Sequence, residues 1–111
     1  MQNKNNHTLM RSIIADEKYW FNLHRKLIKP RALDLADTIF LYLSQHNQYP
    51  EGLNVKISNN PNRNFDFCSD IHFTNPVTQL GTILNAISNI VDNLSEEYNK
   101  VTRIQVSLYY L

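Results

Sequence analysis

The chain has 111 residues, of which 42% are hydrophobic and 19% are charged, and its eleven Lys and Arg nearly balance ten Asp and Glu. A domain of this size buries roughly two thirds of the surface that its unfolded chain exposes, so it needs neither a metal nor a disulfide to fold, and its single cysteine excludes a disulfide-rich secreted scaffold. A net charge of +1 excludes a strongly basic nucleic-acid coat, and no apolar run forms a signal peptide or approaches the roughly 20 residues of a membrane span. We therefore expect a cytoplasmic protein with no membrane partner.

The first half of the chain predicts two helices behind a short polar tail. Residues 1–7 are polar and are predicted to be a disordered tail, which leaves 8–111 as a single α+β domain. From residue 9 to residue 28 the apolar side chains fall mainly at helical spacing, which predicts a helix that ends before Pro30. A second helical pattern begins at Leu33 and continues until the turn residues Pro50 and Gly52.

Three segments of the second half alternate apolar and polar residues and therefore predict strands: 53–58, 65–74 and 103–111. The strongest helical pattern lies between the last two of them. It opens at Asn75 and Pro76, a capping residue followed by proline at the first helical position. The apolar stripe that continues to Tyr98 predicts a helix of about 25 residues.

These elements, in the order ααββαβ, predict a two-layer α+β domain. Each strand has one apolar face and one polar face, so the helices must cover one face of the sheet only. Because a crossover helix joins the second and third strands, those two strands run in the same direction. The predicted fold is a three-stranded mixed sheet with helices on one face.

The uncovered face of this sheet is the first candidate site. Its side chains combine both charges with amides, an aromatic ring and an imidazole, which suits a protein partner held by complementary charge and hydrogen bonds. An ordinary solvated sheet face is the alternative interpretation. The predicted partner-binding residues are Lys56, Asp66, Asp70, His72, Arg103, Gln105 and Tyr109.

An enzyme hypothesis rests on Cys68, Asp70 and His72, which alternate on that face. A cysteine nucleophile needs a base within hydrogen-bond reach, but residues two apart on a strand are separated by about 6.5–7 Å. A small hydrolase or nuclease centred on His72 is therefore only the second alternative, and we predict that the chain is not an enzyme. The four histidines lie in separate predicted elements and the two glycines form no nucleotide fingerprint, so we predict no metal site and no cofactor.

The joint between the first two predicted helices is the second candidate site. Arg25, Lys26, Lys29 and Arg31 place four cations within seven residues, which can contact phosphates or an acidic protein surface. The structural alternative is that cations in the last turn of a helix complement its dipole. A nucleic-acid-associated regulator that uses this joint is the first alternative function.

Elimination favours a protein-binding module over an enzyme. Immunity proteins and phage-encoded inhibitors are small α+β proteins that neutralise a toxin or another enzyme, such as a nuclease, by covering its active site. The carboxylates of Asp92, Glu96 and Glu97 would add contacts to such a partner. The main prediction is therefore an immunity or inhibitor protein with a protein partner, and a homo-oligomer stays an open alternative.

Overall fold

Strands and helices follow one another in the order β, α, β, β, α, β. The computed structural model describes residues 12–62 and 64–110. Its elements are β1 (Ser12–His24), the short 3-10 helix η1 (Arg25–Leu27), α2 (Ile28–Gln45), β2 (Gly52–Ser58), β3 (Phe67–His72), α3 (Leu80–Asp92) and β4 (Lys100–Tyr110).

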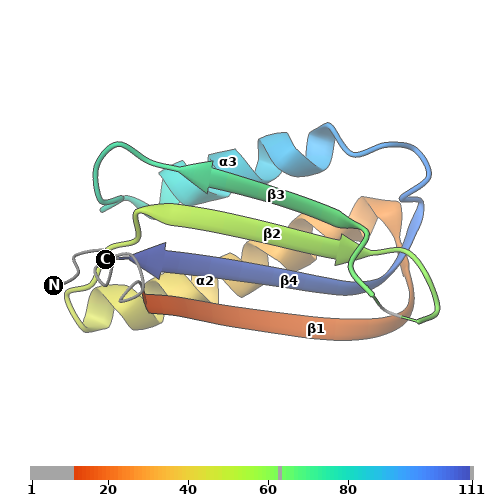
Figure 1. Cartoon of the computed structure of the whole chain (residues 1–111), viewed down its shortest axis with the longest axis horizontal. Helices are drawn as coiled ribbons and strands as arrows, with labels where there is room; N and C mark the ends of the chain where they lie inside the picture. Colours follow the sequence, from red (N-terminus) through yellow and green to blue (C-terminus); the bar gives the residue numbers. More distant parts are fainter. Residues whose placement is uncertain (1–11, 63, 111) are drawn as a thin grey trace, which may run out of the picture.

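The four strands form one sheet in the order β1-β4-β2-β3 (Figure 1). Every neighbouring pair is antiparallel, with Ser12 opposite Tyr110, Val55 opposite Val106 and Asn54 opposite Asp70. It follows that β1 and β2 run in the same direction with β4 between them, and that β3 and β4 do so with β2 between them. Each helix therefore connects the two strands of a split βαβ unit.

Both helices lie on the same side of the sheet, behind it in Figure 1. The apolar side chains of the strands and of the two helices meet between these layers and form one hydrophobic cluster. Its fully buried members are Ile28, Ala32, Ala36, Leu43, Leu53, Val55, Ile57, Ile83, Ile87, Val101, Ile104, Val106 and Leu108. The opposite face of the sheet carries no helix and stays open.

The predicted helix over residues 9–28 is wrong, because residues 12–24 form strand β1. In that strand Ile14 and Trp20 pack against the core, while Glu17 and Tyr19 lie on the other face of the sheet. β-branched and aromatic residues favour strands over helices, and β4 offers a pairing partner along this segment. The open face of β1 carries the apolar Ile13 and Ala15, and its helix-facing side carries the charged Asp16 and Lys18. The segment therefore lacks the apolar alternation of a half-buried strand, which explains why its spacing also matched a helix.

The predicted order ααββαβ and the three-stranded mixed sheet are wrong for the same reason. With β1 included, the sheet has four strands and is antiparallel throughout. The strands before and after α3 do run in the same direction, but β2 lies between them. No parallel pair of neighbours results, so the sheet is not mixed.

The helix boundaries also differ from the sequence pattern. Helix α2 begins at Ile28, and Pro30 lies in its first turn, where a missing backbone N–H costs nothing. Helix α3 begins only at Leu80, because Gln79 is extended and the N–H of Val77 donates to the carbonyl of Pro50 at 2.8 Å. It ends at Asp92, and the rest of the apolar stripe, Leu94 and Tyr98, covers the core from a turn.

The predicted tail over residues 1–7 lies outside the described residues. Among those that the structure describes, no helix has the length and the apolar character needed to cross a membrane.

Candidate functional site

The open face of the sheet is built by the outward-facing side chains of all four strands. Six of the seven predicted partner-binding residues lie on it, because alternate residues of a strand point to the same side. A shallow hollow of about 340 Å³ marks its centre. The hollow is lined by Ile13, Ala15, Asn54, Lys56, Asp70, Gln105, Ser107 and Tyr109.

Asp70 is the centre of a hydrogen-bonded group at one end of this face. Its carboxylate accepts from the Tyr109 hydroxyl at 3.1 Å and from the Asn54 amide at 3.2 Å. The Nε2 atom of His72 lies 3.6 Å from the same carboxylate, and its ring meets that of Tyr109 edge to face at 5.4 Å. Asn54 also donates to the sulfur of Cys68 at 3.4 Å. Strands β2, β3 and β4 thus hold a fixed polar cluster.

Arg103 is the centre of a second group toward the other end of the face. Its guanidinium donates to both oxygens of Glu17 at 3.0 Å, and Gln105 donates to the same carboxylate at 2.8 Å. The guanidinium also lies 3.9 Å from the ring centre of Phe65 and 5.0 Å from that of Tyr19. An arginine between two aromatic rings is held in one orientation.

This network lowers the pKa of Glu17 below its ordinary value of 4.5, chiefly through the hydrogen bond from Tyr19 and then through that from Arg103. A carboxyl whose pKa is lowered by folding stabilises the fold fully above its ordinary pKa, and this contribution disappears as the pH falls through the lowered value.

The Glu17→Gln variant tests this effect by urea denaturation at several pH values below 4.5. Its free energy of unfolding should fall less steeply with decreasing pH than that of the unchanged chain, because the amide does not titrate. Tyr19→Phe should lie between the two, and an unchanged slope in Glu17→Gln would contradict the assignment.

Asp66 does not join the other predicted residues. Its carboxylate accepts from the Tyr98 hydroxyl at 3.0 Å and from the Asn60 amide at 3.0 Å, at the end of the sheet. Burial, together with this hydrogen bond to Asp66, raises the pKa of Tyr98 to about 12. The regular alternation begins only at Phe67, so Phe65 takes the place on the open face that the pattern predicts for Asp66. Asp66 therefore contacts Tyr98 and Asn60 rather than the other predicted residues.

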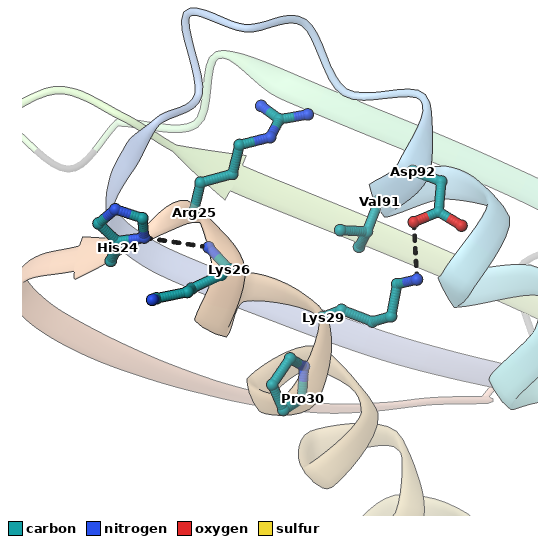
Figure 2. A pocket seen from close by; sticks show the side chains of 7 residues that line it. All are labelled: His24, Arg25, Lys26, Lys29, Pro30, Val91 and Asp92. Carbon is teal, nitrogen blue, oxygen red and sulfur yellow. Dashed lines mark hydrogen bonds and ion pairs between the residues drawn. The ribbon is translucent and has the colours of Figure 1, made fainter.

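The basic joint surrounds a hollow of about 540 Å³ where η1 meets the end of α3 (Figure 2). Arg25 donates to the carbonyls of Leu94 and Ser95, both at 2.7 Å, and to that of Tyr98 at 3.3 Å. Lys29 forms an ion pair of 2.6 Å with Asp92, as Figure 2 shows. Two of the four predicted cations therefore bind other parts of this chain.

The remaining residues of the joint have weaker contacts. The backbone N–H of Lys26 donates to the imidazole of His24 at 3.3 Å, which caps η1, and the Lys26 side chain is exposed. Arg31 lies 4.0 Å from Asp34, one turn further along α2. The joint thus serves first as a structural junction between β1 and the segment that follows α3.

Cys68, Asp70 and His72, the side chains of the enzyme hypothesis, do not form a nucleophile–base pair. Asp70 and His72 are neighbours, but Cys68 contacts Asn54 rather than a base. Within residues 12–62 and 64–110, no group of three or more His, Cys, Asp and Glu side chains is placed to hold a metal ion.

Strand β1 supplies candidate site residues that the sequence analysis missed. Ile13, Ala15, Glu17 and Tyr19 complete the open face, and Phe21 is 91% exposed where the register of β1 shifts against β4. The sequence from Ile13 to Trp20 carries no period of two, because apolar and charged residues fall on both faces of the strand. Its β-branched and aromatic residues are the only local signal, and the pairing with β4 decides the strand.

No family model and no curated protein matches this chain. Solved structures do match it. The insertion ternary complex of Dbh DNA polymerase gives a TM-score of 0.70 at 14% identity, over 87% of this chain and 28% of that chain. DinB from Sulfolobus solfataricus gives 0.68 at 14% identity, over 86% and 28%. The little finger domain of PolIV, solved in complex with the beta-clamp processivity factor, gives 0.64 at 8% identity, over 90% and 89%.

These likenesses correct the main functional prediction. An immunity or toxin-neutralising inhibitor protein is wrong as an interpretation, because the structures that resemble this chain are DNA polymerases and a polymerase domain. The chain spans about 28% of the polymerase chains and 89% of the little finger chain. It therefore has the fold of the little finger domain of PolIV and of the corresponding part of Dbh and DinB.

Proposed function

We propose that this chain is a binding module without catalytic activity, which contacts nucleic acid through the open face of its sheet. The observation that carries the proposal is the shared fold with a domain of DNA polymerases, combined with a sheet face that no helix covers. Four-stranded sheets with helices behind them and aromatic side chains in front are a recurrent platform for nucleic acids.

The chemistry of the open face suits this ligand. Lys56 and Arg103 offer positive charge to phosphates, and the amides of Asn54 and Gln105 can donate and accept hydrogen bonds. The rings of Tyr19 and Phe65 flank Arg103 at the border of the face and provide surfaces on which bases stack. Binding of this kind uses shape and hydrogen bonds more than bulk charge.

The charge balance of the face limits how strongly salt affects binding. Glu17 and Asp70 lie beside the two cations, so the face carries about as much negative as positive charge. Two phosphate contacts correspond to a slope of about −2 in log affinity against log salt concentration. A slope several times steeper would point to the basic joint instead.

The first test compares two lysines. Anisotropy of a short fluorescent DNA duplex, and of its single strand, would measure affinity for the unchanged chain, Lys56→Gln and Lys26→Gln. We expect Lys56→Gln to weaken binding about tenfold and to reduce the salt slope by about one, since it removes one phosphate contact. The matched control Lys26→Gln removes the same charge from the joint and should leave the affinity unchanged.

Two results would contradict the proposal. A loss of affinity in Lys26→Gln alone would transfer the interface to the joint between β1 and α2. Absence of binding to both probes at low salt would exclude nucleic acid as the ligand of this chain.

A protein partner is the second candidate. The little finger domain of PolIV was solved with the beta-clamp, and Phe21 of this chain is an apolar ring with 91% of its surface exposed. Such a ring is typical of a residue that anchors a protein interface. The same titration with a purified beta-clamp in place of DNA distinguishes the two candidates, because Phe21→Ser would affect only the second.

A further inference from the structure

Strand β3 lies at the edge of the sheet and, within the described residues, pairs with β2 only. The N–H of Phe73 donates to the carbonyl of Glu51, and hydrogen-bonded pairs alternate along an antiparallel ladder. The residues that bond to β2 are therefore Phe67, Ser69 and Ile71. The backbone groups of Cys68, Asp70 and His72 point away from the sheet and are open to a further strand.

A groove runs between this free edge and α3. It has a volume of about 420 Å³, and Phe67 and Ile71 of β3 and Ala86 and Ile90 of α3 supply its apolar walls. All four side chains are only half-buried, so the helix does not cover the core-facing side of β3. Asn89 and Asn93 also line the groove, and no charged residue does.

The other edge of the sheet is protected, whereas β3 is not. The register of β1 shifts between Tyr19 and Leu23, and the consecutive charges of Asp16, Glu17 and Lys18 lie in its middle. Bulges and charges are the devices by which proteins keep edge strands from pairing. The β3 ladder is regular from Phe67 to His72, so it is the edge that can accept a strand.

We infer that the β3 edge and its groove bind an extended segment of a partner protein, which adds a fifth antiparallel strand to the sheet. Backbone hydrogen bonds to Cys68, Asp70 and His72 supply affinity, and alternate side chains of the segment enter the groove. Because the groove has no charged lining, these side chains are apolar and uncharged. The intervening side chains face the exposed Cys68, Asp70 and His72 and are polar.

The position of α3 favours an isolated strand, rather than a second copy of this chain, as the occupant of the groove beside β3. In Figure 1 this helix extends past β3, beyond the edge of the sheet. An added strand would lie over α3 and fill the groove. A second copy of this chain, paired through its own β3, would bring its own α3 into the same space. The groove therefore fits a segment without a helix layer of its own.

The test uses a capped peptide that alternates valine with threonine and carries a lysine at each end. Titrated into the ¹⁵N-labelled chain, it should shift the amide signals of 67–72 and 83–93 and leave those of β1 in place. Methylating the threonine amides, which would face Cys68, Asp70 and His72, should abolish these shifts. Methylating the valine amides instead, which would face solvent, should preserve them.

Substitutions in the groove provide the second arm. Ala86→Arg places a long charged side chain between α3 and β3, and Asn89→Arg does the same from an exposed position that does not affect the core. Each should weaken peptide binding about tenfold or more. The matched control is Asn85→Arg, which adds the same charge to an exposed residue of α3 outside the groove and should bind as the unchanged chain does.

Several outcomes would overturn the inference. The first is the absence of shifts in β3 at millimolar peptide, and the second is equal binding by the two methylated peptides. The third is equal affinity in Asn85→Arg and Asn89→Arg. The fourth is a dimer of the peptide-free chain in analytical ultracentrifugation whose dissociation on dilution shifts the amide signals of 67–72. This site is the outer edge of β3, whereas the proposed phosphate contacts are Lys56 in β2 and Arg103 in β4. Its test contains no nucleic acid, so its failure would leave the proposed function unaffected.

Discussion

Replacing Gly52 with alanine should displace the Tyr109 ring from the open face and destabilise the chain by about 1–3 kcal/mol, as overpacking of a filled site does. The two residues are paired across β2 and β4, and the ring lies directly over the glycine. A Cβ atom at Gly52 would come within 1.8 Å of the ring carbon Cζ and 2.3 Å of the hydroxyl oxygen. No adjustment of a few tenths of an ångström relieves such a contact, so the ring must move.

Displacement would also dismantle the cluster around Asp70, because the Tyr109 hydroxyl donates to that carboxylate. The free energy of unfolding from urea denaturation measures the loss of stability, and the amide signals of Asp70 and His72 report the change in the cluster. Under the proposed function, DNA affinity should fall as well.

Two further variants make the prediction sharp. Gly81→Ala is the matched control, since a Cβ atom there meets nothing within 4 Å and alanine favours a helix by about 0.5–1 kcal/mol. It should raise stability slightly. In a Tyr109→Ser background, Gly52→Ala should cost little, because the clashing ring is gone. Equal costs of Gly52→Ala in both backgrounds would contradict the close contact as the cause.

The second large effect is expected at Arg25. Its guanidinium donates to the carbonyls of Leu94, Ser95 and Tyr98, three acceptors from the turn that follows α3. Hydrogen bonds from a charged donor contribute about 1.5–3 kcal/mol, and Arg25→Ala leaves all three carbonyls without this donor. We expect the free energy of unfolding to fall by about 2 kcal/mol in urea denaturation.

The neighbouring residue serves as the control for this effect. Lys26→Ala removes a cation from the same hollow, but its side chain is exposed, so stability should change by less than about 0.5 kcal/mol. Arg25→Lys should recover only part of the loss, because an ammonium group lacks the planar fork that reaches several acceptors. If Arg25→Ala were as stable as Lys26→Ala, Arg25 would not be a structural residue.

Local patterns in the sequence were sufficient to locate three strands and the polar face that they share. The alternation at Leu53, Val55 and Ile57 and again along 103–110 determines which side chains can be buried, since successive residues of a strand point to opposite sides. The same rule placed Lys56, Arg103 and Gln105 on one face before their distances were known.

Only the tertiary structure decided the identity of β1. Its segment carries apolar residues at spacings that match a helix and β-branched and aromatic residues that favour a strand, and such ambiguity is resolved by what packs beside it. Pairing with β4 along 12–19 stabilises the strand. This single choice changes the sheet from three strands to four, and it brings Glu17 and Tyr19 to Arg103 across 84 or more positions of the chain.

The tertiary structure also decided which partner each charged side chain binds. A cluster such as Arg25 to Arg31 has the same composition whether it binds phosphate or its own chain, and the outcome depends on acceptors far away in sequence. Here Arg25 donates to the carbonyls of Leu94 and Ser95 after α3, and Lys29 forms an ion pair with Asp92. The position of Asp66 in the alternation predicts a place on the open face, but its carboxylate accepts a hydrogen bond from the Tyr98 hydroxyl instead. The sequence by itself determined which residues alternate along a strand and which are charged. Only the packing of distant segments decided which side chains contact one another, because contacts between distant segments depend on chain topology rather than on neighbouring residues.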